Sequence, residues 1–98
     1  MLGALGLSAG VPMLGVNGTQ TTSKTLWEDG KEHIDVENPN PGQRPGQIHY
    51  QDGVNKYIYN VESGEFEGLS NTQSKQLLSR PEVQQAIDKG LRYLGVSR

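Results

Sequence analysis

Two short segments of the chain carry titratable residues at alternating positions. In the segment HIDVE, His33, Asp35 and Glu37 alternate with Ile34 and Val36. Because successive side chains of a β-strand point to opposite faces, we expect the three titratable groups on one face of a strand. A histidine beside carboxylates can take up and release protons near neutral pH, as general acid–base catalysis requires.

The segment QIHYQ repeats this alternation and places Gln47, His49 and Gln51 on one face of a second strand. The loop between the two segments holds one cation, Arg44, and its prolines predict a stiff connection. If the strands pair, an acid, a base and a cation for a developing negative charge lie in one patch. The candidate catalytic residues are therefore His33, Asp35, Glu37, Arg44 and His49.

This set of groups suits cleavage of RNA by its own 2′-hydroxyl. Glu37 or His33 would remove the 2′-proton and His49 would protonate the leaving 5′-oxygen. Arg44 would stabilise the pentacoordinate phosphate, and Asp35 would orient a histidine. The chain has no cysteine and only two histidines, without a metal-ligand spacing, so we expect neither a metal nor a cofactor. The structural alternative is the solvated polar face of a half-exposed strand.

The segment KYIYNV, residues 56–61, is rich in strand formers and carries the candidate substrate-binding residues. Tyr57 and Tyr59 share a face with Val61, which fits core packing and equally fits a platform on which RNA bases stack. Lys56 beside them is placed to contact a phosphate or simply flanks the hairpin. Glu62, Glu65 and Glu67 form an acidic edge beyond this strand.

The elements that must position these groups follow from the change of hydrophobic period along the chain. Residues 24–69 alternate and are broken by turn signals such as Asp52-Gly53, which predicts several short strands. From Ser70 the period becomes helical, with capping boxes at Ser70 and Ser79. We expect an α+β fold, a small twisted antiparallel sheet with a C-terminal helix packed on it through Val83, Ile87, Leu91 and Leu94.

Composition divides the 98 residues into two parts. Residues 1–23 contain no charged side chain and many glycines, so we expect a flexible linker or junction there, followed by one domain over residues 24–98. The apolar stretch at the start is interrupted by glycines and falls short of the ~20 residues of a spanning helix, so no stable membrane association is expected. The net charge of −2 argues against coating nucleic acid by bulk charge.

The stretch HIDVENPNPGQRPGQIHYQ, followed by KYIYNVESGEFEG, resembles the C-terminal toxin domains of bacterial polymorphic toxins of the contact-dependent growth inhibition and Rhs types. The ending PEVQQAIDKGLRYLG is similar to the closing helix of these domains. The resemblance covers residues from about 31 to 95. It is greatest to the group that cleaves ribosomal RNA in the manner of the ribosome-inactivating colicins, although Ile58 stands where those colicins carry a glutamate.

The resemblance implies a colicin-ribonuclease-like toxic endoribonuclease that cleaves RNA in target bacteria, with 16S ribosomal RNA of the small subunit as the expected substrate. It also implies delivery as part of a larger secreted or surface-exposed effector, action in the target-cell cytoplasm, and a cognate immunity protein. We expect that inhibitor to place carboxylates near Arg44 and Lys56. The alternatives are a toxin nuclease that acts on tRNA or DNA, and a non-catalytic protein-binding module.

Overall fold

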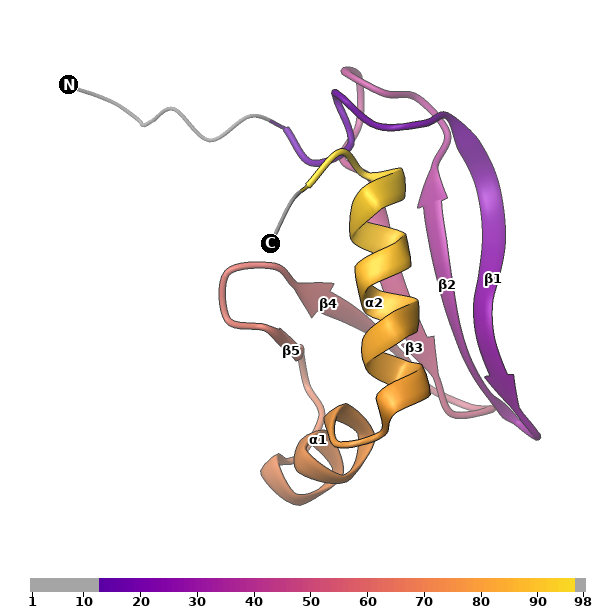
Figure 1. Cartoon of the computed structure of the whole chain (residues 1–98), viewed down its shortest axis with the longest axis vertical. Coiled ribbons are helices and arrows are strands. Elements are labelled where there is room, and N and C mark those ends of the chain that lie inside the picture. Colours follow the sequence, from indigo (N-terminus) through magenta and orange to yellow (C-terminus); the bar gives the residue numbers. More distant parts are fainter. Residues whose placement is uncertain (1–12, 97–98) are drawn as a thin grey trace, which may run out of the picture.

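The computed structural model describes residues 13–96 and confirms the α+β fold. Five antiparallel strands follow one another across a single sheet in sequence order, and two helices complete the chain (Figure 1). The strands are β1 (Thr21–Asp29), β2 (Glu32–Asn38), β3 (Gln47–Gln51), β4 (Lys56–Asn60) and β5 (Glu65–Phe66). The helices are α1 (Asn71–Leu78) and α2 (Pro81–Tyr93).

Helix α2 lies across one face of the sheet and buries the core against it (Figure 1). Ile34 and Val36 of β2 are completely buried on this face, as predicted from the alternation in HIDVE. The predicted stripe of α2 faces them, and its buried members are Val83, Ala86, Ile87, Gly90, Leu91 and, just after the helix, Leu94. We call the opposite side of strands β2 to β4 the open face.

Gly90 explains how closely α2 approaches the sheet. A Cβ atom at this position would come within 2.9 Å of Cδ1 of both Ile48 and Leu26. Such a separation is shorter than ordinary van der Waals contact between carbon atoms. The absence of a side chain at Gly90 therefore lets the helix backbone rest directly on the side chains of β1 and β3.

The N-cap of the capping box predicted at Ser70 is present, although the Gln73 side chain accepts from the Ser70 hydroxyl and not from its backbone N–H, and the box predicted at Ser79 is wrong. Ser70 caps α1, and its hydroxyl accepts a hydrogen bond from the backbone N–H of Gln73 at 3.2 Å. Ser79 instead ends α1, and its hydroxyl donates to the carbonyl of Gln76 at 2.8 Å. Because Pro81 already occupies the first position of α2, the N-cap falls on Arg80, which makes no side-chain cap.

The chain joins the domain earlier than the predicted boundary at residue 24. Strand β1 begins at Thr21, and the backbone N–H of Thr19 donates to the carbonyl of Tyr93 at 2.7 Å. The fully buried Asn38 donates through Nδ2 to the carbonyl of Gly15 at 2.9 Å and more weakly to that of Thr19 at 3.3 Å. The predicted linker is therefore corrected for residues 13–23, because distant polar partners fix this charge-free segment. The remainder of that prediction, residues 1–12, lies outside the described residues.

Within residues 13–96, neither helix has the length and apolar character needed to cross a membrane.

Candidate active site on the open face of the sheet

The register of the central strands brings the predicted catalytic residues together. Asp35 of β2 lies directly opposite His49 of β3, and Glu37 lies opposite Gln47. His33 pairs with Gln51 and is therefore a diagonal neighbour of His49. All of these side chains belong to the face of the sheet that α2 does not cover. The convergence predicted from the two alternating segments is thus present.

His33 and Asp35 form a pair along β2. Nδ1 of His33 lies 2.9 Å from Oδ2 of Asp35, and both side chains remain partly exposed, at 28% and 18%. A carboxylate at one ring nitrogen fixes the orientation of an imidazole and leaves the other nitrogen, Nε2, to exchange a proton. Asp35 is therefore in contact with the histidine that it was expected to orient.

His49 occupies a different environment on the same face. It is only 7% exposed, and its Nε2 lies 2.7 Å from Oε1 of Gln47. With the amide oxygen as acceptor, neutral His49 carries its proton on Nε2 and its lone pair on Nδ1. Burial lowers the pKa of His49 below its usual 6.5, and the Lys56 ammonium adds to this effect against the opposing carboxylates of Glu37 and Asp35. His49 is therefore a mainly neutral base at pH 7.

Arg44 reaches the same face from the loop between β2 and β3. Its Nη2 lies 3.5 Å from Oε1 of Glu37, and the arginine side chain is 55% exposed. Strong charge-assisted hydrogen bonds between such groups are shorter, at about 2.7–2.9 Å. The guanidinium is therefore held near the site by Glu37 while most of its donors stay accessible to a phosphate.

The structure separates the three predicted substrate-binding residues. Lys56 lies opposite Gln51 on the open face, and its charge acts on His49. Tyr57 and Tyr59 instead point to the helix-covered side, where Tyr57 stacks on Tyr50 with ring centroids 5.9 Å apart. Tyr59 is 4% exposed and packs edge-on against Phe66. A base platform made of these two tyrosines is therefore wrong for this face, and the core-packing alternative holds.

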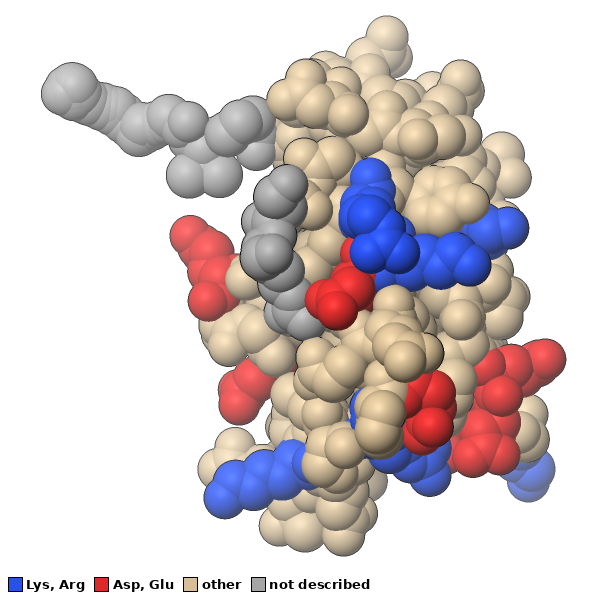
Figure 2. Space-filling model, in the orientation of Figure 1, with Lys and Arg blue, Asp and Glu red and all other residues tan. Residues whose placement is uncertain are grey.

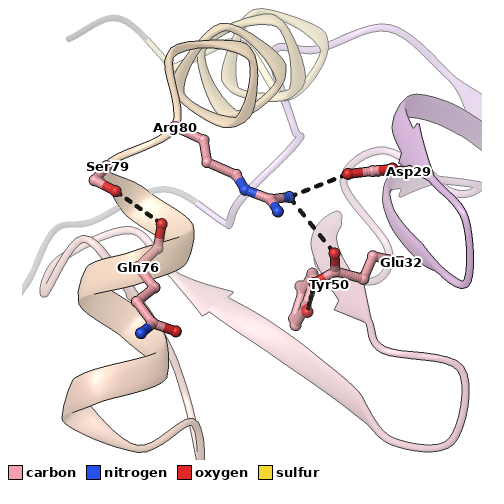
Figure 3. Close-up of polar contacts among 6 residues, drawn as sticks. All are labelled: Asp29, Glu32, Tyr50, Gln76, Ser79 and Arg80. Carbon is pink, nitrogen blue, oxygen red and sulfur yellow. Dashed lines mark hydrogen bonds and ion pairs between the residues drawn. The ribbon is translucent and has the colours of Figure 1, made fainter.

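The sequence did not predict a polar cluster around Arg80, which lies on the helix-covered side of the sheet beside the β1–β2 hairpin (Figure 3). Nη1 of Arg80 lies 3.5 Å from Oε1 of Glu32 and 3.6 Å from Oδ2 of Asp29, and its guanidinium lies 5.3 Å over the ring of Trp27. The hydroxyl of Tyr50 donates to the other oxygen of Glu32, and burial raises the pKa of that tyrosine. A pocket of about 370 Å³ lies between this cluster and α1.

The cluster ties the start of α2 to the β1–β2 hairpin, so replacing Arg80 by Gln should lower the free energy of unfolding by about 1–2 kcal/mol. This range combines one cation–π contact with two partly exposed ion pairs. Urea denaturation would measure the change. Arg92→Gln is the matched control on the same helix, because Arg92 is exposed and should change stability by no more than about 0.5 kcal/mol. Equal effects of the two variants would contradict this role for Arg80.

The lowered pKa of His49 predicts a loss of stability on acidification. Below about pH 6.5 this histidine binds a proton in the unfolded chain, while in the folded domain it stays neutral to a lower pH. The unfolding free energy should therefore fall as pH drops from 7.5 to 5.5, and His49→Gln should remove part of that slope. Urea denaturation at several pH values measures it, with His33→Gln as the control that retains the buried histidine. A slope unchanged in His49→Gln would contradict the prediction.

Within residues 13–96, no group of three or more histidine, aspartate or glutamate side chains is arranged to hold a metal ion.

The helix-covered face carries both signs of charge, with Lys and Arg side chains over the C-terminal half of α2 and acidic ones near the β1–β2 hairpin (Figure 2).

Comparisons of the chain with family models, with curated proteins and with solved structures find no match.

Proposed function

We propose that the domain is a metal-independent endoribonuclease that cleaves RNA through attack of the 2′-hydroxyl on the adjacent phosphate. The observation that carries the proposal is the placement of two histidines on one face, each with its own partner. Asp35 orients His33 and Gln47 orients His49. Two separate proton-transfer groups are what this reaction needs, because one must remove a proton while the other supplies one.

The spacing of the two histidines suits a phosphodiester between them. The Cα atoms of diagonal neighbours on adjacent antiparallel strands are about 7–8 Å apart, so both side chains can reach one phosphate group. The base takes the proton of the 2′-hydroxyl, and O2′ forms a bond to phosphorus. The bond from phosphorus to the 5′-oxygen then breaks, and that oxygen receives the proton of the acid. The products are a 2′,3′-cyclic phosphate and a free 5′-hydroxyl.

The environments of the histidines revise the roles expected from the sequence. His49 was expected to be the general acid, but its lowered pKa keeps it unprotonated at neutral pH, which is the form that a general base requires. His33 then serves as the acid, because Asp35 holds its Nδ1 and leaves its Nε2 to deliver a proton to the leaving oxygen. Arg44 stabilises the charge that develops on the phosphate, and Glu37 holds that arginine near the site.

The target and the biological setting rest on the resemblance to polymorphic toxin domains. It supports RNA of target bacteria as substrate, with 16S ribosomal RNA as the first choice, reached after delivery as part of a larger effector. The resemblance also supports the existence of a cognate immunity protein. Such an inhibitor would neutralise the enzyme by placing carboxylates against Arg44 and Lys56, with an association that weakens as salt rises.

Induced expression in bacteria tests the proposal. The parent protein should arrest growth and produce RNA fragments with 2′,3′-cyclic phosphate ends, while His49→Gln and Arg44→Ala should do neither. Arg92→Gln is the control, because it removes an exposed cation on the far side of the sheet. Primer extension across 16S ribosomal RNA locates the cleavage, and cuts confined to tRNA would replace that target. Growth arrest that persists in His49→Gln without RNA cleavage would favour the protein-binding alternative.

A further inference from the structure

Ile58 is an apolar side chain on the otherwise polar open face. It lies directly opposite His49 in the pairing of β3 with β4 and is 40% exposed. The apolar residues of β2 and β3, namely Ile34, Val36 and Ile48, are instead buried beneath α2. A single exposed apolar residue is ordinary on protein surfaces, so its exposure alone carries no argument. Its position against the proposed general base is the informative feature.

Lys56 lies two residues before Ile58 and on the same face of β4. It is exposed, and its ammonium group is close enough to act on His49. The carboxylates of the site, Asp35 and Glu37, come from β2 on the other side of His49. Lys56 therefore places a positive charge on the side of His49 opposite these carboxylates, while Glu65 and Glu67 lie at the far end of β4, beside Asn60. A phosphate of an RNA backbone is attracted to Lys56.

We propose that Ile58 and Lys56 form a subsite for one unpaired nucleotide beside the cleaved phosphodiester. The face of the base rests on Ile58, and the neighbouring phosphate contacts Lys56. This inference rests on the proposed ribonuclease function. Isoleucine offers no hydrogen bond to a base edge, so the contact tolerates any base. It does require the face of the base to be uncovered, and in a duplex that face is occupied by stacking. The subsite therefore selects single-stranded RNA.

Binding measurements in a cleavage-deficient background test the subsite. All proteins would carry His33→Gln, and the probe would be a fluorescein-labelled mixed-sequence RNA of about 12 nucleotides, either single-stranded or annealed to its complement. Ile58→Ser should weaken single-strand binding about 5- to 10-fold, at the lower end of the range for a base platform, without changing the salt dependence. Lys56→Gln should reduce the slope of log K against log salt by about 0.7. Lys89→Gln on α2 is the matched control and should leave single-strand affinity and the salt slope unchanged.

Several outcomes would overturn the subsite. The first is an affinity for single-stranded RNA that Ile58→Ser leaves unchanged. The second is an equal loss of affinity for single-stranded and duplex RNA in Ile58→Ser, and the third is the absence of RNA binding by every variant. A Lys89→Gln effect equal to that of Lys56→Gln would also reject it, since the contact would then be general charge attraction. Far-UV circular dichroism confirms that each variant is folded.

The subsite and the proposed function can fail separately. Selective single-strand binding by the His33→Gln protein, with no cleavage by the protein that retains His33, would refute the ribonuclease and keep the subsite. Cleavage of single-stranded RNA with the same kcat/KM in Ile58→Ser and the parent would refute the subsite and keep the ribonuclease.

Discussion

Replacing His49 by Gln is expected to lower the rate of RNA cleavage by about 10²- to 10⁴-fold, the usual contribution of a positioned general base. Glutamine approximates the size of the ring, so the fold should persist while proton uptake is lost. The acidic limb of the pH–rate profile of the parent should have its midpoint below 6.5, because burial lowers the pKa of this histidine. Single-turnover cleavage of a short RNA measures both effects.

A second variant, His33→Gln, distinguishes the roles of the two histidines. His33→Gln should also slow cleavage strongly, but it should retain the acidic limb, because that limb belongs to the base His49. The double variant should be little slower than either single one, since groups that act as a unit are not additive. An acidic limb that disappears in His33→Gln instead would exchange the two roles.

Replacing Asn38 by Asp is expected to destabilise the domain by about 3–5 kcal/mol, the effect of an uncompensated buried charge. Asn38 is fully buried, and its amide nitrogen donates to the carbonyls of Gly15 and Thr19. An aspartate of the same shape turns a carboxylate oxygen toward those two carbonyl oxygens. A loss of this size is a large part of the stability of a small domain. Thermal and urea denaturation would measure it.

The pH dependence of this variant identifies the cause. Burial raises the pKa of the new carboxyl in the folded state. As the pH falls and this carboxyl becomes neutral, the unfolding free energy of Asn38→Asp should therefore rise relative to that of the parent. Asn40→Asp, two residues later in the exposed loop, is the matched control and should cost no more than about 0.5 kcal/mol. A large loss in Asn38→Asp that did not change with pH would point to lost packing instead of buried charge.

The central strands could be predicted because one local rule governs them. Strict alternation in HIDVE and QIHYQ determines which side chains share a face, and a short proline-containing loop makes antiparallel pairing the simple outcome. The grouping of His33, Asp35 and His49 follows from these two facts. The helical stripe from Val83 to Leu94 was predictable for the same reason, since its period is regular.

Other features depend on contacts that no local pattern encodes. KYIYNV presents large side chains on both faces, so its alternation could not decide whether the tyrosines or Ile58 meet α2. The segment around Gly15 resembles a linker because it has no charge and many glycines, yet Asn38, more than twenty residues later, satisfies its carbonyl. Arg80 gave no sequence signal, since its partners come from a distant hairpin.

The contact between Thr19 and Tyr93 joins the two ends of the described chain at one pole of the molecule (Figure 1). The approach is so close that a Cβ atom at Gly95 would lie 2.7 Å from the backbone of Asn17. A force pulling these ends apart would act on this contact first and then peel the first strand and last helix away from each other, breaking few hydrogen bonds at a time. The domain should therefore offer little mechanical resistance to unfolding from its ends.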